Sequence, residues 1–487
     1  MDERIFWNGI DGRHGGYLFT PSRTAELAAL VKESSDSQVQ PLRRSTPLRQ
    51  ELWARRGVVF GAQRRPRTQA VRFGGLIYGI DPEDLGQAGW AAIFPQTGDP
   101  AVQEALWPLL ELRRKEAAMS SERRFRVLAG ADGYRAGELP LTFLERQGVG
   151  PGPVDPDKLP YYLLLVGGAR EIPFEFQYQL ASQYAVGRLA SESPEEYARY
   201  AAGLVALANG RTRLPRQAAF FGVWHADDPA TQDSSTRLVA PLAAALRRKC
   251  PACEVQTILG EEATKARLAR LLGGDETPSL LFTASHGLGF PCGDPLQREL
   301  QGAIICNDWP GPEDWPHEEP IPPEHIFAAA DIGTHARLNG LILFLYACFG
   351  AGTPRRNGFA KRENRPSHAL APEAFVARLP QRLLGHPNGT AVAVIGHVDR
   401  TWGSSFLWKR AGQQLQAFES ALRALLDGRR VGWAMDGFSL RRGELAAALN
   451  AELEHETGDP LRLPGLWTAH NDARSFAILG DPAARLP

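Results

Sequence analysis

A histidine and a cysteine each follow an apolar run of the kind that forms a buried strand. His286 comes after residues 279–284, and Cys348 comes after residues 341–347. A thiol that attacks a carbonyl needs a base for its proton, and the resulting oxyanion needs N–H donors aimed at it. His286 can serve as that base, while the N–H groups of Gly287 and Cys348 can form the donor pair. Because a thiol is already a good nucleophile, the two side chains can suffice for acyl-transfer chemistry.

The elements that must position this pair follow from the hydrophobic pattern after residue 210. The expected strands are 218–223, 254–259, 279–284, 341–347, 390–395 and 475–479, and the expected helices are 235–249, 263–272 and 372–384. This alternation predicts a parallel sheet with crossover helices on both faces. In such sheets, reactive groups lie outside the carboxyl ends of the strands, where His286 and Cys348 are expected.

A shorter alternation precedes the main one. Its expected strands are 90–94, 125–129 and 161–167, and its expected helices are 102–117, 139–147 and 194–209. Upstream of it the periodicity is weak, and arginines cluster between Arg43 and Arg67. We therefore expect an irregular basic segment over 1–84, a small α/β subdomain over 85–210 and a catalytic α/β domain over 211–487.

Composition narrows the classes of function. The chain has 487 residues, with Lys+Arg 55 balanced by Asp+Glu 55, 43% hydrophobic and 23% charged residues, and only five cysteines. The zero net charge argues against a general nucleic-acid binder, and no apolar run is long enough for a membrane span. Residues 1–4 do not begin a signal peptide, so we expect a cytoplasmic protein without a disulfide framework.

Further short motifs stand in a fixed order around the two strand ends. They are Leu-Leu-Val-Gly (164–167), Ile-Pro (172–173), Tyr-Ala-Val-Gly-Arg (184–188), Ala-Val-Ile-Gly (393–396), Trp-Gly (402–403) and Ile-Leu-Gly-Asp-Pro (478–482). Together with Ser-His-Gly and Ala-Cys-Phe-Gly, this order resembles the caspase-like cysteine peptidases, which include caspases, gingipains, separase and bacterial CHAT domains. The resemblance covers about residues 85–487.

The resemblance implies a caspase-like sheet and hydrolysis of peptide bonds, with His286 as general base and Cys348 as nucleophile. Protein or peptide substrates, no cofactor and a possible activating protein partner go with it. The sequence departs from the gingipain pattern at Gly168 and Gln183, where that group usually has acidic residues. Intracellular bacterial caspase-like proteins are the nearer comparison.

The residue recognised before the scissile bond is expected to be charged. Trp402 is a candidate wall of its pocket, by likeness to gingipains. Asp399, Asp227 and Asp228 would favour a basic side chain, whereas Arg400 would favour an acidic one. We expect a preference for Arg or Lys.

Other readings of the same residues stay open. His225 and Asp228, with His286 or His397, could hold a divalent metal ion in a hydrolase. Four cysteines could bind structural zinc; they are Cys250, Cys253, Cys292 and Cys306. A silent caspase-like scaffold is the third alternative. Residues 291–335 form an excursion, which we expect to be a lid or a docking loop for a partner.

Overall fold

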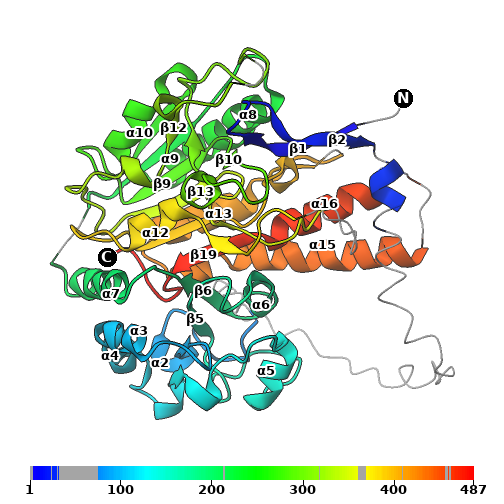
Figure 1. The fold of residues 1–487 in the computed structure, drawn as a ribbon. Helices are drawn as coiled ribbons and strands as arrows, with labels where there is room; N and C mark the ends of the chain where they lie inside the picture. The colour runs from blue at the N-terminus through cyan, green and yellow to red at the C-terminus, as the bar shows by residue number, and fades with distance from the viewer. Residues whose placement is uncertain are drawn as a thin grey trace, which may run out of the picture.

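The computed structural model describes residues 4–23, 25–29, 31, 75–211, 214–316, 319–359, 369–408, 410–455, 459 and 462–487. At its centre lies a ten-stranded sheet (Figure 1). Its strands are β3 (Trp90–Ile93), β4 (Phe125–Leu128), β5 (Tyr162–Val166), β6 (Ala185–Leu189), β7 (Gln217–Gly222), β8 (Glu254–Leu259), β9 (Leu280–Ala284), β13 (Ile342–Tyr346), β16 (Ala393–His397) and β19 (Phe476–Gly480).

The sheet consists of two halves that run in opposite directions. Its order is β4-β3-β5-β6-β19-β16-β13-β9-β7-β8, and β19 pairs antiparallel with β16 while all other neighbours pair parallel. We call β4-β3-β5-β6-β19 the first half-sheet and β16-β13-β9-β7-β8 the second half-sheet. The carboxyl ends of the two halves therefore lie at opposite edges, and the predicted parallel-rich α/β class is confirmed.

Helices cover this sheet. They are α2 (Leu85–Ala88), α3 (Pro100–Ala105), α4 (Trp107–Ala117), α5 (Pro140–Arg146), α6 (Phe174–Leu180), α7 (Pro194–Ala208), α8 (Pro229–Asp233), α9 (Ala240–Lys249), α10 (Lys265–Leu271), α11 (Gln297–Leu300), α12 (Arg378–Leu384), α13 (Gln416–Leu426), α14 (Val431–Ala434), α15 (Asp436–His455) and α16 (Arg462–Arg474). Every residue of β5, β9 and β13 is buried, which requires cover on both faces. None of the helices in the described ranges is long and apolar enough to cross a bilayer.

The N-terminal residues differ from the irregular segment expected there. β1 (Arg4–Asp11) and β2 (Tyr17–Arg23) form an antiparallel hairpin, and β1 pairs in parallel with β10 (Leu288–Gly289). In Figure 1 this hairpin, drawn in blue, lies beside α8. The arginine cluster between Arg43 and Arg67 lies outside the described residues. The strands of 85–210 belong to the same sheet as those of 211–487, and the three-part domain division stays a prediction.

The excursion 291–335 is folded into the protein and, in its described residues, is not a separate lid. β11 (Ile304–Ile305) pairs with β12 (Ile326–Phe327), and the Trp309 side chain is fully buried. Apolar residues spaced along the excursion supply this core, although the regular elements there are as short as α11, β11 and β12. The other short strand pairs are β14 (Gly352–Thr353) with β15 (Phe375–Val376) and β17 (Leu407–Trp408) with β18 (Gly412–Gln413).

Candidate active site

The parallel pairing of β9 and β13 sets His286 beside Cys348. Tyr346 is in register with Ala284, and each reactive residue stands two positions beyond its strand partner. A Cβ atom built on Gly287 would lie 1.8 Å from the carbonyl oxygen of Cys348, so only glycine fits there. Both reactive side chains line one cavity of about 260 Å³. The structure thus brings together the two residues predicted from the strand ends.

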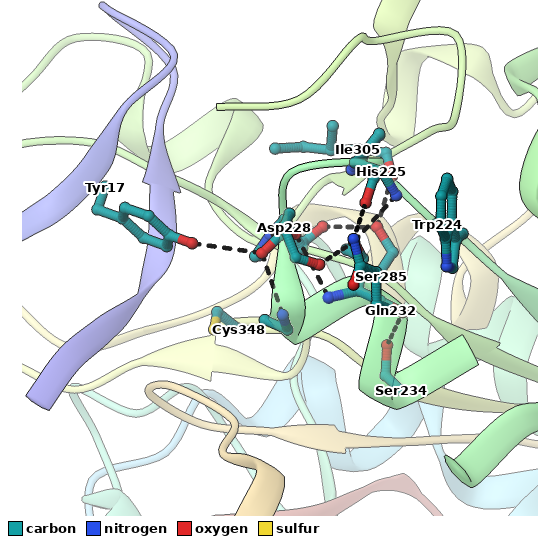
Figure 2. Close-up of polar contacts among 12 residues, drawn as sticks. Tyr17, Trp224, His225, Asp228, Gln232, Ser234, Ser285, Ile305 and Cys348 are labelled. Atoms are coloured by element: carbon teal, nitrogen blue, oxygen red, sulfur yellow. Dashed lines mark hydrogen bonds and ion pairs between the residues drawn. The ribbon is translucent and has the colours of Figure 1, made fainter. Parts of the chain in front are cut away.

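Asp228 completes a chain of polar groups. Its Oδ2 atom lies 2.5 Å from Nε2 of His286, and the side chain is fully buried. As N-cap of α8, Asp228 also accepts hydrogen bonds from the N–H groups of Ala230 (3.1 Å) and Thr231 (3.4 Å). Burial alone would raise the pKa of Asp228, but the charge and hydrogen bond of His286 hold it well below its usual range. Figure 2 shows this carboxylate at the centre of the polar contacts.

The Asp228 contact decides which imidazole nitrogen can serve as a base. With the Nε2–H group donating to Asp228, the neutral ring carries its lone pair on Nδ1. The neighbouring Ser285 hydroxyl shares its single proton between the carbonyl oxygens of His286 (2.8 Å) and Ile305 (2.5 Å), which fixes the backbone that carries the ring. The arrangement can therefore accept a proton at Nδ1 and stabilise the imidazolium through a buried carboxylate.

The thiol of Cys348 is held by Thr401, which sequence reasoning missed. The Sγ atom lies 3.4 Å from the N–H nitrogen of Thr401 and 3.5 Å from its hydroxyl oxygen. Cys348 is only 1% exposed, and burial raises its pKa although the contacts from Thr401 lower it. Phe349 and Asp399 have positive φ angles of 58° and 79°, and the Phe349 N–H donates to the Asp399 carbonyl (2.7 Å). This backbone contact joins the loop after β13 to the loop after β16 and holds the thiol against Thr401.

The cavity beside the dyad has an aromatic wall and one acidic group. Trp402 lines it, with its backbone N–H donating to Asp472 Oδ1 (3.1 Å) and its backbone carbonyl accepting from the Tyr346 hydroxyl (2.6 Å). Among the described lining residues, Asp233 alone carries a carboxylate. Asp233 ends α8 and pairs with Arg237 (3.2 Å), with both side chains partly exposed. In the sequence, Asp233 could have been found from its place five positions after Asp228, the N-cap of α8.

Four of the predicted pocket residues do not line this cavity. The Asp228 carboxylate contacts the His286 ring, and Asp227 is exposed on the loop before α8. Asp399 and Arg400 are buried and pair with each other (Nε to Oδ1, 3.1 Å). The Arg400 guanidinium also lies over the rings of Phe19 and Phe359. Their opposite charges cancel each other locally, so neither side chain presents a free charge to the cavity.

The two N–H groups expected to bind the oxyanion, those of Gly287 and Cys348, are not used in backbone pairing among the described residues. Within the part of the chain that the structure describes, the N–H groups of Gly287 and Cys348 donate to no backbone carbonyl. Gly287 instead forms a bridge with Ile304 in which the flanking residues make the hydrogen bonds. Both N–H groups are therefore left for another acceptor.

The residues of the two metal hypotheses are not arranged as metal ligands. Across the described ranges, no three His, Cys, Asp or Glu side chains could hold an ion together. Cys250 and Cys253 form a disulfide, Cys292 is exposed and Cys306 is buried. The hypothetical zinc set is thus dispersed, and His397 pairs with Asp472 (3.2 Å) away from Asp228.

Comparisons with known proteins give distant structural neighbours. No protein-family model matches the sequence, and no curated protein matches it significantly. The Arg-specific cysteine proteinase gingipain R is similar in structure, with 13% identity, a TM-score of 0.48 and coverage of 82% of this chain and 78% of that one. A complex of the pro- and mature domains of RgpB from Porphyromonas gingivalis has 14% identity, a TM-score of 0.45 and coverage of 82% and 79%.

The separase–securin complex from Saccharomyces cerevisiae is more distant, with 10% identity, a TM-score of 0.32 and coverage of 67% of this chain and 16% of that one. These values are too low to assign an activity to this chain.

Proposed function

We propose that this chain is a caspase-like cysteine endopeptidase that cleaves protein or peptide substrates after a basic residue. The observation that carries the proposal is that His286 and Cys348, at the carboxyl ends of two adjacent parallel strands, line one cavity, while the buried Asp228 carboxylate contacts the His286 ring from behind. A base held by a carboxylate next to a thiol is the arrangement that nucleophilic acyl transfer requires.

The first step activates the thiol. Because burial raises the pKa of Cys348, the free thiolate is scarce at neutral pH and the proton must pass to a base. His286 takes it at Nδ1, and Asp228 stabilises the resulting imidazolium through Nε2. The sulfur then attacks the carbonyl carbon of the scissile bond.

The next steps use the same groups. The oxyanion of the tetrahedral intermediate accepts hydrogen bonds from the N–H groups of Gly287 and Cys348. His286 returns its proton to the leaving amine, which leaves an acyl group on Cys348. Water, deprotonated by His286, hydrolyses this thioester and restores the free thiol.

The cavity supports a preference for a basic side chain. Asp233 lies on its lining, while Tyr346, Trp402 and Phe406 provide apolar walls for the stem of an Arg or Lys. The exposed pairing with Arg237 is weak and leaves Asp233 able to exchange partners. The expected cytoplasmic location and an activating partner remain part of this proposal.

The test is covalent labelling with two biotinylated acyloxymethyl ketones that carry Arg or Asp before the warhead, with the labelled cysteine located by mass spectrometry. We expect the Arg probe to label Cys348 at least about tenfold faster than the Asp probe. Labelling should be lost in His286→Ala and kept in Cys306→Ala, a control for the other buried free thiol among the described residues.

The two parts of the proposal fail separately. Faster labelling by the Asp probe would overturn the basic preference but keep the peptidase. If Cys348 reacts with neither probe, and reacts with iodoacetamide equally in the wild type and in His286→Ala, the dyad is inert and the scaffold alternative is favoured.

A further inference from the structure

The N-terminal hairpin is docked against the segment that carries His286. β1 pairs with β10 at Ile10–Leu288 and Asp11–Gly289, two and three residues beyond His286 respectively. The N–H of Gly12 donates to the carbonyl of Gly289 (2.9 Å). The Arg13 guanidinium forms a two-pronged pair with Asp294 (2.7 and 2.8 Å). The hairpin is therefore held in a defined position relative to the dyad.

Tyr17, at the start of β2, reaches from this hairpin into the polar chain. Its hydroxyl donates to Oδ1 of Asp228 (3.3 Å), on the oxygen opposite to the one that contacts His286. Figure 2 shows the ring directed at Asp228 from the hairpin. The Tyr17 and His286 rings also meet edge to face, with centroids 6.4 Å apart. Tyr17 thus touches both groups that activate the thiol.

Toward the Asp228 carboxylate the phenol acts as the hydrogen-bond donor. Burial and the negative charge of Asp228 raise the pKa of Tyr17, so the hydroxyl stays neutral across the working range. The Oδ1 atom of Asp228 also accepts a hydrogen bond from the N–H of Ala230 (3.1 Å). With Tyr17 and Ala230 on Oδ1, and His286 and Thr231 on Oδ2, rotation of the carboxylate is resisted from both sides.

We propose that Tyr17 is a positioning residue for the Asp228–His286 pair, which makes the N-terminal hairpin part of the catalytic apparatus. This inference rests on the proposed dyad. By fixing Oδ1, Tyr17 keeps Oδ2 facing Nε2 of His286, which keeps the Nδ1 lone pair in place for the thiol. Sequence reasoning missed Tyr17 because it lies 211 positions from its hydrogen-bond partner.

The test measures alkylation of Cys348 by iodoacetamide, in which the S–C bond forms, iodide leaves and His286 takes the thiol proton. We expect Tyr17→Phe to slow it about tenfold, with an unchanged melting temperature. In the His286→Ala background, Tyr17→Phe should have no further effect, because Tyr17 acts through His286. With a peptide substrate, kcat should fall and KM should stay the same.

Tyr162→Phe is the matched control, since its hydroxyl donates to the Pro82 carbonyl (2.8 Å) in the first half-sheet. It should alkylate at the wild-type rate. The inference is overturned if Tyr17→Phe alkylates at or above the wild-type rate, or if it slows the His286→Ala protein by the same factor. If the protein hydrolyses no peptide, but Tyr17→Phe slows alkylation in the wild type and not in His286→Ala, the proposed peptidase is overturned and the role of Tyr17 is supported.

Discussion

The two half-sheets bury charged side chains in different ways. In the first half-sheet, Arg188 is fully buried and donates to Gln177 Oε1 (2.8 Å) and to the carbonyl of Gly167 (2.9 Å). Asp481, just after β19, accepts from Arg113 (2.6 Å) and from the Trp90 indole (2.9 Å). These groups are paired inside packed protein, which is how buried charges stabilise a fold without reacting.

In the second half-sheet the buried chain of polar groups ends at open space. Asp228 contacts His286, and His286 lies beside Cys348 where both line the cavity of about 260 Å³. The difference between the halves teaches that burial of a charge does not by itself mark a reactive site. In the second half-sheet the series of titratable groups ends at a cavity, and we expect substitutions of these groups, but not of the buried charges in the first half-sheet, to lower catalysis.

Loss of the nucleophile should have the largest effect. We expect Cys348→Ala to lower the rate of peptide hydrolysis at least about 10⁴-fold, because the proposed acyl intermediate forms on its thiol. Cys306→Ala removes a buried thiol away from the cavity and should leave the rate unchanged. Hydrolysis that persists in Cys348→Ala would place the chemistry elsewhere.

Two buried aspartates give the direct contrast between the halves. Asp228→Asn should lower kcat by about 10²–10³-fold, since a neutral amide cannot stabilise the imidazolium. Asp481→Asn should leave kcat unchanged but lower the free energy of unfolding by about 3 kcal/mol, because the Arg113 side chain stays buried with weaker pairing. Urea unfolding and single-turnover assays of both variants test this, and an exchange of the two phenotypes would contradict it.

Specificity should respond to the acidic group of the cavity. We expect Asp233→Asn to lower kcat/KM about tenfold for substrates with Arg before the scissile bond. Substrates with a neutral residue there should change less than about twofold. Asp227→Asn is the matched control, because Asp227 is exposed outside the cavity. An equal loss for both substrates would assign Asp233 a structural role.

The last expected effect is on the pH dependence of stability, not on catalysis. Burial, with the nearby His286 charge second, lowers the pKa of His225 to about 4, whereas an unfolded chain titrates near 6.5. The stability that this neutral side chain contributes is present above about pH 6.5 and is lost as pH falls toward 4. We expect His225→Gln to reduce the loss of unfolding free energy between pH 7.5 and pH 4.5 by about 2 kcal/mol.

His470 is the control for that measurement, since burial also lowers its pKa to about 4 at a place far along the chain. The pH dependence of the unfolding free energy that comes from His470 should remain in His225→Gln. An unchanged slope in that variant would show that His225 does not titrate as its burial indicates. Asp228 does not interfere with this measurement, because its pKa is lowered in the folded protein. The stability that its carboxylate contributes is therefore lost only as the pH falls below about 4.

Much of the sheet follows from local pattern. The strands expected at 254–259, 279–284 and 341–347 differ from the observed ones by at most one residue at either end. Adjacent parallel strands with reactive residues at their carboxyl ends bring those residues together, so the proximity of His286 and Cys348 was predictable.

The partners of the dyad were not predictable in the same way. Asp227 and Asp228 have the same chemistry, and only the N-cap geometry before Pro229 decides which one is buried against His286. Asp399 and Arg400 were read as separate charges, whereas they pair with each other. The N-terminal hairpin depends on pairing with β10, far along the chain, which no local period reveals.

The position of β19 has a consequence for biosynthesis. This strand, Phe476–Gly480, comes last in the described chain yet lies in the middle of the sheet, between β6 and β16. Asp472, shortly before it, fixes the backbone of Trp402 in the cavity wall. A nascent chain therefore exposes His286 and Cys348 on the ribosome before it can join the half-sheets or finish the cavity. Under the proposed function, we therefore expect thiol chemistry to begin only after the chain has been synthesised through Gly480.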